Sequence, residues 1–314
     1  MIRTFVLERS KLREQESGAG HDLTAASWID LQDPDEQERA RVEQLFPTTL
    51  PEADEVEDIE SSARYFVEGG DLHVHSLFLY QSEGRLRTAT VAFTLQSDRL
   101  ISIRDVELPD FRLTRLRARR GWVEAVSPLQ ILTALLEQKV NNLADQLEDL
   151  HRDLEQLSME VLENRESDLG EKLDRLAKLE DSNGQIRLCL MDTQRSTSFL
   201  LRHVRDRKNE VKTFREILRD LDTLMAHATF VFEKINFLMN AAQGFINIRQ
   251  NQIIKIFSIA AVVFLPPTLV GTVYGMNFEV MPELDWVLGY PMALGLMAIS
   301  AISPYLFFKH KGWL

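Results

Sequence analysis

The sequence is poor in the residues and motifs that mark enzymes and exported proteins. Cys189 is the only cysteine, so no intrachain disulfide bond is possible, and its thiol is expected to be a small buried group. The first apolar run is too short for a cleavable signal segment, and charges follow it at once. Neither a glycine-rich phosphate loop nor a nucleophile–base pair is visible, so we expect no enzyme and no organic cofactor.

Basic residues are in the minority. The 314 residues include 48 Asp and Glu but only 36 Lys and Arg, which gives a net charge of −12. Because nucleic-acid binding requires a basic surface, no nucleic-acid partner is expected, whereas divalent cations are compatible with the acidic balance. His73 and His75 alternate on a predicted strand and face one side, but no third metal ligand is apparent near them.

Charge is absent from two long stretches near the C-terminus, 256–278 and 286–308. Each stretch is apolar and can span the hydrocarbon layer of about 30 Å, which takes about 20 helical residues. Almost all charged residues lie upstream of them. We therefore predict a soluble body followed by a membrane-spanning helical hairpin.

The soluble body is predicted to begin with a small α/β domain, residues 1–122. Apolar alternation and β-branched residues indicate strands at 2–7, 25–31, 72–80, 87–95 and 100–103. Helices are expected at 35–45 and at 52–61. The first is preceded by an acid and a proline, which is typical of a helix start.

An acidic helical hairpin is expected over residues 123–210. Apolar residues recur there at alternating steps of four and three, which is typical of a helix packed against another helix. They are Leu136, Val140, Leu143, Leu147, Leu150, Leu154, Leu157 and Val161. Between Glu137 and Asp181 there are 14 acidic and 6 basic side chains, which indicates either a solvated coiled-coil surface or an acidic arm that gathers cations.

The remaining boundaries follow from the membrane hairpin. A stalk helix over 211–274 is predicted to continue into the first span, about 256–274, although Pro266 and Pro267 are expected to kink or loosen it. An extracytoplasmic loop, a second span and a basic tail follow at 275–285, 286–308 and 309–314. The loop has no Lys or Arg, so the positive-inside rule places both termini in the cytoplasm.

The segment from Tyr274 to Leu284, YGMNFEVMPEL, resembles the signature loop of CorA magnesium channels. The ending FKHKGWL is similar to that family's basic tail, and the resemblance extends over the whole chain. The related ZntB zinc transporters have a different residue set in this loop. The resemblance implies an α+β membrane protein with an N-terminal cytoplasmic α/β domain, a long helical coiled-coil region and two C-terminal transmembrane helices, assembled as a cyclic oligomer.

The family resemblance also implies a function. It implies a multi-pass channel of the inner membrane for potential-driven Mg²⁺ influx, with Co²⁺ and Ni²⁺ as further candidate ions. The expected partners are divalent cations, membrane lipid and further copies of the chain, with a pentamer as the family expectation. Two helices cannot enclose a water-filled path alone, so several copies around an axis are required.

The resemblance places the selectivity filter at Gly275, Met276 and Asn277. Mg²⁺ keeps several of its waters, and carboxamide and carbonyl oxygens can bind the hydrated ion weakly enough to release it. The alternative is that Gly275 and Asn277 only cap a helix end. Helical spacing back from Asn277, together with the resemblance, predicts a pore-facing row of side chains. Its members are Asn251, Ile254, Phe257, Leu265 and Thr268, whose apolar members could otherwise only pack between helices.

Charged residues outside the pore have three expected roles. Glu279 and Glu283 would concentrate cations at the outer mouth or remain solvated turn charges. Asp58 and Glu216 match the family's regulatory Mg²⁺ site between subunits, although Glu216 stands where the family has aspartate. Lys309 and Lys311 would form a cytoplasmic basic belt or act as interfacial anchors.

Two other functions remain open from the sequence. One is a ZntB-like transporter of zinc or another divalent cation. The other is a membrane-anchored scaffold that conducts no ions. A scaffold would tolerate substitution of Asn277, whereas a channel would not.

Overall fold

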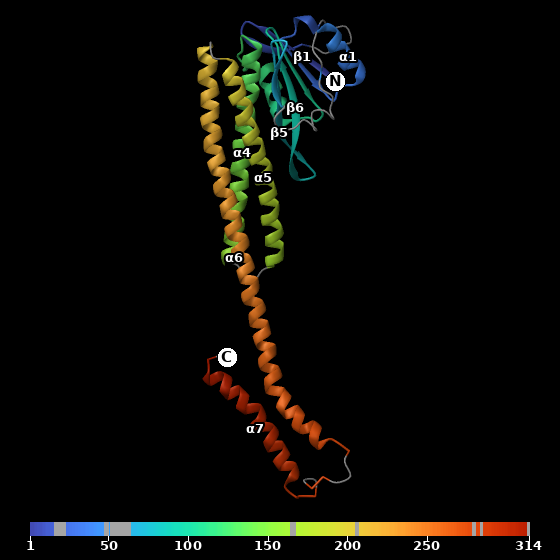
Figure 1. Cartoon of the computed structure of the whole chain (residues 1–314), viewed down its shortest axis with the longest axis vertical. Helices are drawn as coiled ribbons and strands as arrows, with labels where there is room; N and C mark the ends of the chain where they lie inside the picture. Colours follow the sequence, from blue (N-terminus) through green and yellow to red (C-terminus); the bar gives the residue numbers. More distant parts are fainter. Residues whose placement is uncertain are drawn as a thin grey trace. The chain divides into compact units, whose positions relative to one another are not determined.

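A computed structural model describes most of the chain. The described residues are 1–15, 23–46, 50, 64–163, 168–204, 207–277, 281–282 and 285–312. They form two compact units, Met1–Met239 and Asn240–Leu314. Helix α6, Lys208–Tyr274, contributes residues to both units (Figure 1).

The N-terminal unit contains a seven-stranded mixed sheet. Its strands are β1 (Ile2–Glu8), β2 (Lys11–Glu14), β3 (Trp28–Gln32), β4 (Tyr65–Glu68), β5 (Asp71–Ser82), β6 (Arg85–Leu95) and β7 (Leu100–Arg104). The spatial order is β2-β1-β3-β7-β6-β5-β4. The central pair β3 and β7 is parallel, and every other neighbouring pair is antiparallel.

Helices account for most of the rest of the chain. They are η1 (Leu23–Ala25), α1 (Glu36–Leu45), α3 (Pro109–Arg119), α4 (Pro128–Glu163), α5 (Leu169–His203), α6 and α7 (Gly289–His310). Asp35 caps α1 through a capping box with Glu38, which satisfies backbone donors that a helix start leaves free. Asp168 accepts hydrogen bonds from the first backbone amides of α5 in the same way.

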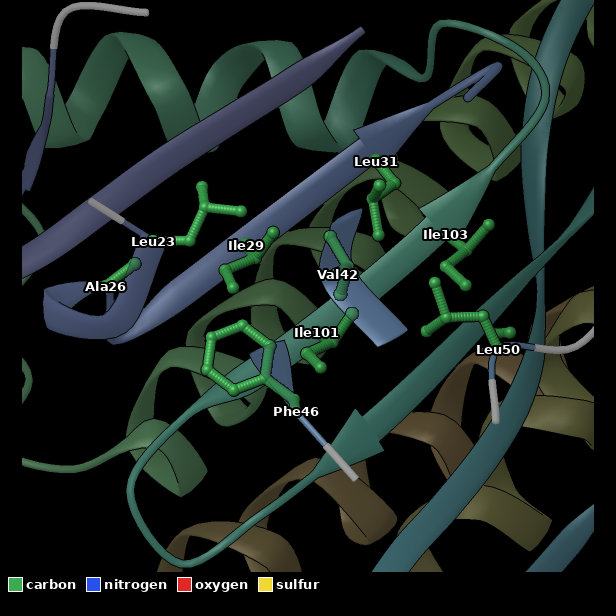
Figure 2. Close-up of a cluster of buried hydrophobic side chains, with 10 residues drawn as sticks. Leu23, Ala26, Ile29, Leu31, Val42, Phe46, Leu50, Ile101 and Ile103 are labelled. Carbon is green, nitrogen blue, oxygen red and sulfur yellow. The ribbon is translucent and has the colours of Figure 1, made fainter. Parts of the chain in front are cut away.

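The odd-numbered residues of β3 and β7 form a hydrophobic core under α1. Successive strand residues point to opposite faces, and Ile29, Leu31, Ile101 and Ile103 therefore share one face. Figure 2 shows them packed with Val42 of α1 and with residues around it. Parallel register places Ile29 beside Ile101 and Leu31 beside Ile103, so this layer is a continuous aliphatic surface.

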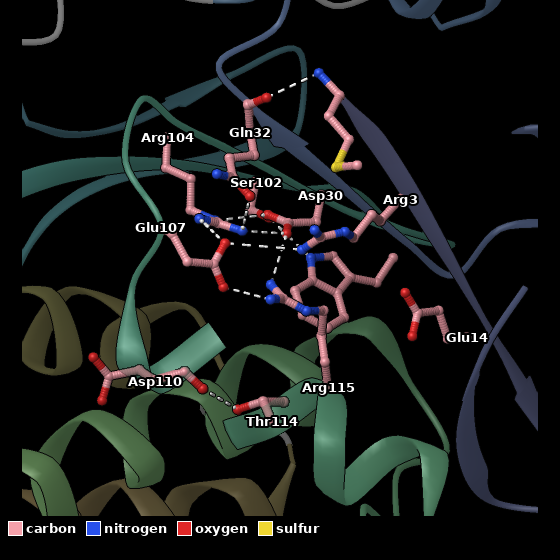
Figure 3. Close-up of polar contacts among 12 residues, drawn as sticks. Arg3, Glu14, Asp30, Gln32, Ser102, Arg104, Glu107, Asp110, Thr114 and Arg115 are labelled. Atoms are coloured by element: carbon pink, nitrogen blue, oxygen red, sulfur yellow. Dashed lines mark hydrogen bonds and ion pairs between the residues drawn. The ribbon is translucent and has the colours of Figure 1, made fainter. Parts of the chain in front are cut away.

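The even-numbered residues of the same strands face α3 and carry a buried ion pair. Arg104 Nη2 lies 2.9 Å from Asp30 Oδ2, and both side chains are 0% exposed. Asp30 also accepts a hydrogen bond of 2.9 Å from Ser102 Oγ, which in turn accepts one of 2.9 Å from Trp28 Nε1. Figure 3 shows this network meeting Arg115 of α3. The sheet thus has an aliphatic face and a face with a polar network.

Helices α4, α5 and the N-terminal part of α6 lie side by side (Figure 1). The predicted heptad residues of α4 are all buried, which confirms the helix-packing interpretation of their spacing. A similar row on α6 was not singled out in the sequence. Its buried members within the N-terminal unit are Phe214, Ile217, Leu221, Ala228, Val231, Ile235 and Leu238.

A buried charged group joins these helices to the sheet. Lys139 Nζ of α4 lies 3.6 Å from Asp192 Oδ2 of α5. The same oxygen accepts hydrogen bonds from Ser76 Oγ at 2.6 Å and from the Leu77 amide at 2.8 Å, both on β5. Because each charge is paired and hydrogen-bonded, this group holds the helices in one register on the sheet.

The structure corrects several expected elements. The predicted strand over 25–31 begins at Trp28 and follows the short helix η1. Strands β2 and β4 and helix α3 had not been predicted. The expected helix over 52–61 lies outside the described residues. Helix α6 is assigned as continuous through Pro266 and Pro267, and it begins at Lys208 rather than near residue 211.

Asp110, at the start of α3, makes stability depend on pH. Its side chain is fully buried, and burial raises the pKa of its carboxyl group to about 7, opposed by the charge of Lys139. The folded state then binds a proton that the unfolded state has lost, so stability falls as pH rises from about 4 through 7. Asp110→Asn is therefore expected to raise the melting temperature above that of wild type at pH 8 but not at pH 4. The measurement is thermal unfolding of both purified proteins at the two pH values.

Candidate ion-conduction site

The C-terminal end of α6 presents the predicted filter residues to solvent. The Gly275 amide donates to the Gly271 carbonyl at 3.0 Å, and the Met276 amide donates to the Val273 carbonyl at 3.3 Å. A Cβ at Gly275 would lie 3.0 Å from the Gly271 oxygen, so a glycine suits this tight helix end. Asn277 follows directly and is exposed, next to the negative end of the helix dipole, which favours cations.

The predicted pore-facing residues lie on one face of α6. A helix turns about 100° per residue, so Asn251, Ile254, Phe257, Leu265 and Thr268 fall within about one third of its circumference. All five are exposed, and Phe257 and Leu265 are 70% and 69% exposed. This face combines polar residues near its ends with apolar residues between them.

The opposite face of α6 is the one covered by α7. The partly buried residues there include Val263, Pro267, Val270 and Tyr274, whose directions are centred about 180° from the row described above. A Cβ at Gly271 would lie 3.5 Å from Met297 Cε of α7, which shows how closely α7 approaches. Helix α7 therefore lies nearest the partly buried side of α6, and the predicted pore-facing residues stay exposed.

Two threonines, Thr268 and Thr272, follow the two prolines in this part of α6. Pro266 and Pro267 lack amide donors and leave carbonyls one turn earlier without their usual partners. Thr268 Oγ1 donates to the Phe264 carbonyl at 2.7 Å, and Thr272 Oγ1 donates to the Thr268 carbonyl at 2.8 Å. In this conformation the Thr268 hydroxyl proton is used within the helix, and its oxygen lone pairs remain for a cation or water.

The structure describes only some of the charged residues to which the sequence gave a role. Glu279, Glu283 and Asp58 lie outside the described residues. Lys309 is near the end of α7 and Lys311 caps it, and both side chains are exposed. Glu216 is exposed on α6, with its Oε1 3.7 Å from Lys212 Nζ.

Glu137 of α4 is a carboxylate near Glu216 to which the sequence gave no role of its own. Partial burial, and then the negative charge of Glu216, raise the pKa of Glu137. Glu137 on α4 and Glu216 on α6 are therefore close enough for their like charges to interact. Glu137 had been counted only among the many acids of the hairpin, because spacing within one helix does not indicate what faces it from another.

Comparisons with known proteins agree over the full length. The family model described as "CorA-like Mg2+ transporter protein" matches residues 24–310. The magnesium transport protein CorA of Escherichia coli (strain K12) is 48% identical over 316 residues, covering 100% of both chains, and that of Salmonella typhimurium is 47% identical over the same extent. The solved CorA magnesium transporter of Methanocaldococcus jannaschii has a TM-score of 0.78 at 17% identity, covering 100% of this chain and 99% of that one.

The fold and the site define a class of membrane protein. The described residues contain an α/β unit and two apolar helices long enough to cross a membrane, the 67-residue Lys208–Tyr274 and Gly289–His310, which is the layout of a membrane transporter. The family match and the full-length identity then decide the family. The chain belongs to the CorA-like Mg²⁺ transporter family, as the YGMN loop had indicated.

Proposed function

We propose that this protein is a Mg²⁺ channel of the inner membrane, assembled as a cyclic homo-oligomer with a pentamer as the expected form. The observation that carries the proposal is the exposed row on α6, from Asn251 to Thr268, which lies opposite the face that α7 covers. Several copies placed around an axis would turn this row inward. The row then lines a path that is polar at its ends and apolar between, and an apolar constriction can close by dewetting.

At the outer end of this path, Gly275, Met276 and Asn277 form the proposed filter. A ring of Asn277 carboxamides and neighbouring carbonyls would accept hydrogen bonds from the waters that Mg²⁺ retains. Glu279 and Glu283 would raise the cation concentration at the mouth, since they carry charge in a loop without Lys or Arg. Both termini are placed in the cytoplasm, where Lys309 and Lys311 form the basic belt.

Entry of Mg²⁺ is proposed to be passive. A divalent ion gains about 4.6 kcal/mol per 100 mV of membrane potential, from two charges at about 2.3 kcal/mol each. The same route admits Co²⁺ and Ni²⁺, which resemble Mg²⁺ in charge and keep a hydration shell of waters. Such a driving force would overfill the cell with Mg²⁺, so the channel needs a closing signal.

We propose that cytoplasmic Mg²⁺ closes the channel by binding between subunits at Asp58 and Glu216. Glu137 of α4 is a second carboxylate near Glu216, since burial and then the charge of Glu216 raise the pKa of Glu137. Asp58→Ala combined with Glu216→Ala is expected to raise the internal Mg²⁺ concentration that closes the channel. The measurement is uptake into vesicles preloaded with graded Mg²⁺, with Asp149→Ala of α4 as a matched surface control. An unchanged closing concentration would remove both acids from the gate.

Flux into proteoliposomes tests the function as a whole. The purified protein is reconstituted with a Mg²⁺-sensitive dye inside, and uptake is followed at set membrane potentials. Potential-driven Mg²⁺ entry is the expected result. Absence of Mg²⁺ entry at low and high internal Mg²⁺, with Zn²⁺ transport in its place, would favour the ZntB-like alternative, and no ion movement at all would favour a scaffold.

A further inference from the structure

Two histidines from different helices face each other in the N-terminal unit, and neither has a role in the proposed channel. His151 Nδ1 of α4 lies 3.3 Å from His227 Nε2 of α6, and the ring centroids are 5.1 Å apart. A tetrahedral metal ion binds imidazole nitrogens at about 2.0–2.1 Å, which places two such nitrogens roughly 3.3 Å apart. The observed separation therefore accommodates an ion as well as a hydrogen bond.

A carboxylate lies beside the other nitrogen of His151, as it often does beside a metal-binding histidine. Its other nitrogen, Nε2, lies 3.5 Å from Glu155 Oε1, one turn along α4. Lys234 Nζ of α6 lies 3.8 Å from the same oxygen. A carboxylate that accepts the Nε2 proton leaves the Nδ1 lone pair free, and this carboxylate–histidine arrangement orients the ring and makes it a better ligand.

The other histidine, His227, is partly buried on α6, and its Nε2 points toward His151. The ring of Phe230 stacks against that of His151 at a centroid distance of 6.0 Å. Coordination at His227 Nε2 requires only that its proton move to Nδ1 of the same ring.

We propose that His151 and His227 form a binding site for a divalent transition-metal ion that ties α6 to α4. Within the described parts of the chain no group of three His, Cys, Asp or Glu side chains is placed to hold a metal, and the proposed site therefore has two protein ligands. Imidazole suits Zn²⁺, Ni²⁺ and Cu²⁺, whereas Mg²⁺ prefers oxygen ligands. The site therefore distinguishes transition metals from Mg²⁺.

The test is calorimetric titration of the full-length protein in detergent with Ni²⁺, with excess Mg²⁺ present to occupy oxygen sites. Wild type is expected to bind one Ni²⁺ per chain at this site. His151→Gln and His227→Gln are each expected to abolish that binding, and Glu155→Gln is expected to weaken it about tenfold. His203→Gln on α5 is the matched control and should bind as wild type does.

A second readout reports the nitrogen ligands directly. In wild type, electron paramagnetic resonance of bound Cu²⁺ is expected to show hyperfine splitting from two imidazole nitrogens, and from fewer in either glutamine variant. Equal Ni²⁺ affinity in wild type and both variants, or no Ni²⁺ binding by wild type, would overturn the proposal. Neither measurement involves ion flux, so the site and the channel function fail or succeed separately.

Discussion

Asn277→Ala is expected to reduce potential-driven Mg²⁺ uptake to background while the protein still assembles. Asn277 is exposed just beyond the end of α6, so removing its carboxamide costs little folding energy. In the assembled channel, however, the substitution removes the proposed ring that binds the hydrated ion, in every subunit at once. Because the potential supplies only the driving force, an ion that finds no favourable site at the mouth does not enter. Uptake is measured in proteoliposomes at fixed potential.

A matched control separates loss of the filter from loss of structure. Ser300→Ala removes a polar group from α7, where Ser300 Oγ donates to the Met297 carbonyl at 2.9 Å. This variant is expected to take up Mg²⁺ as wild type does. Both variants should elute as the same oligomer by size-exclusion chromatography. If Asn277→Ala retains normal uptake at wild-type expression, the filter does not lie at Asn277.

Elements with a strong local pattern could be predicted from the sequence. The heptad of α4 requires only its own spacing, since alternating steps of four and three keep one stripe facing a partner helix. The long apolar runs predicted α7 and the end of α6 for the same reason. Helix α3 has a weaker signal, because four arginines interrupt its apolar residues: Arg112, Arg115, Arg117 and Arg119. Arg115 is nevertheless largely buried, and Glu107 accepts a hydrogen bond from its guanidinium group.

Pairs formed across the fold could not be predicted in this way. Asp30 and Arg104 are 74 positions apart, and His151 and His227 are 76 apart. Sequence spacing contains no information on which strand lies beside which. The parallel pairing of β3 with β7 could therefore not be predicted. His73 and His75, which the sequence singled out, show this limit. Both are buried beside Phe66, where His73 stacks on its ring and His75 meets the ring edge-on, and burial lowers the pKa values of both histidines.

The buried ion pair of β3 and β7 gives the largest expected effect on stability. Asp30→Ala leaves the Arg104 guanidinium without its main partner in a site that is 0% exposed, and it also removes the acceptor of Ser102. Breaking one side of a buried pair typically costs about 3–5 kcal/mol, because the remaining charge is desolvated and uncompensated. Hydrogen–deuterium exchange of peptides from β3 and β7 in the full-length protein should accelerate strongly.

The alternative explanation, that Asp30 contributes only packing volume, predicts a different response to a second substitution. Replacing both partners, as in Asp30→Leu with Arg104→Met, removes the unpaired charge together with its cost, so most of the lost protection should return. In Asp30→Ala, Glu107 still lies 3.3 Å from Arg104 Nη1 and reduces the loss of stability. Because Glu107 is partly solvated, it compensates the Arg104 charge only in part. Asp149→Ala, which breaks an exposed pair with Arg152, should cost less than about 1 kcal/mol. If the double variant is as unprotected as Asp30→Ala, shape rather than charge pairing stabilises this face of the sheet.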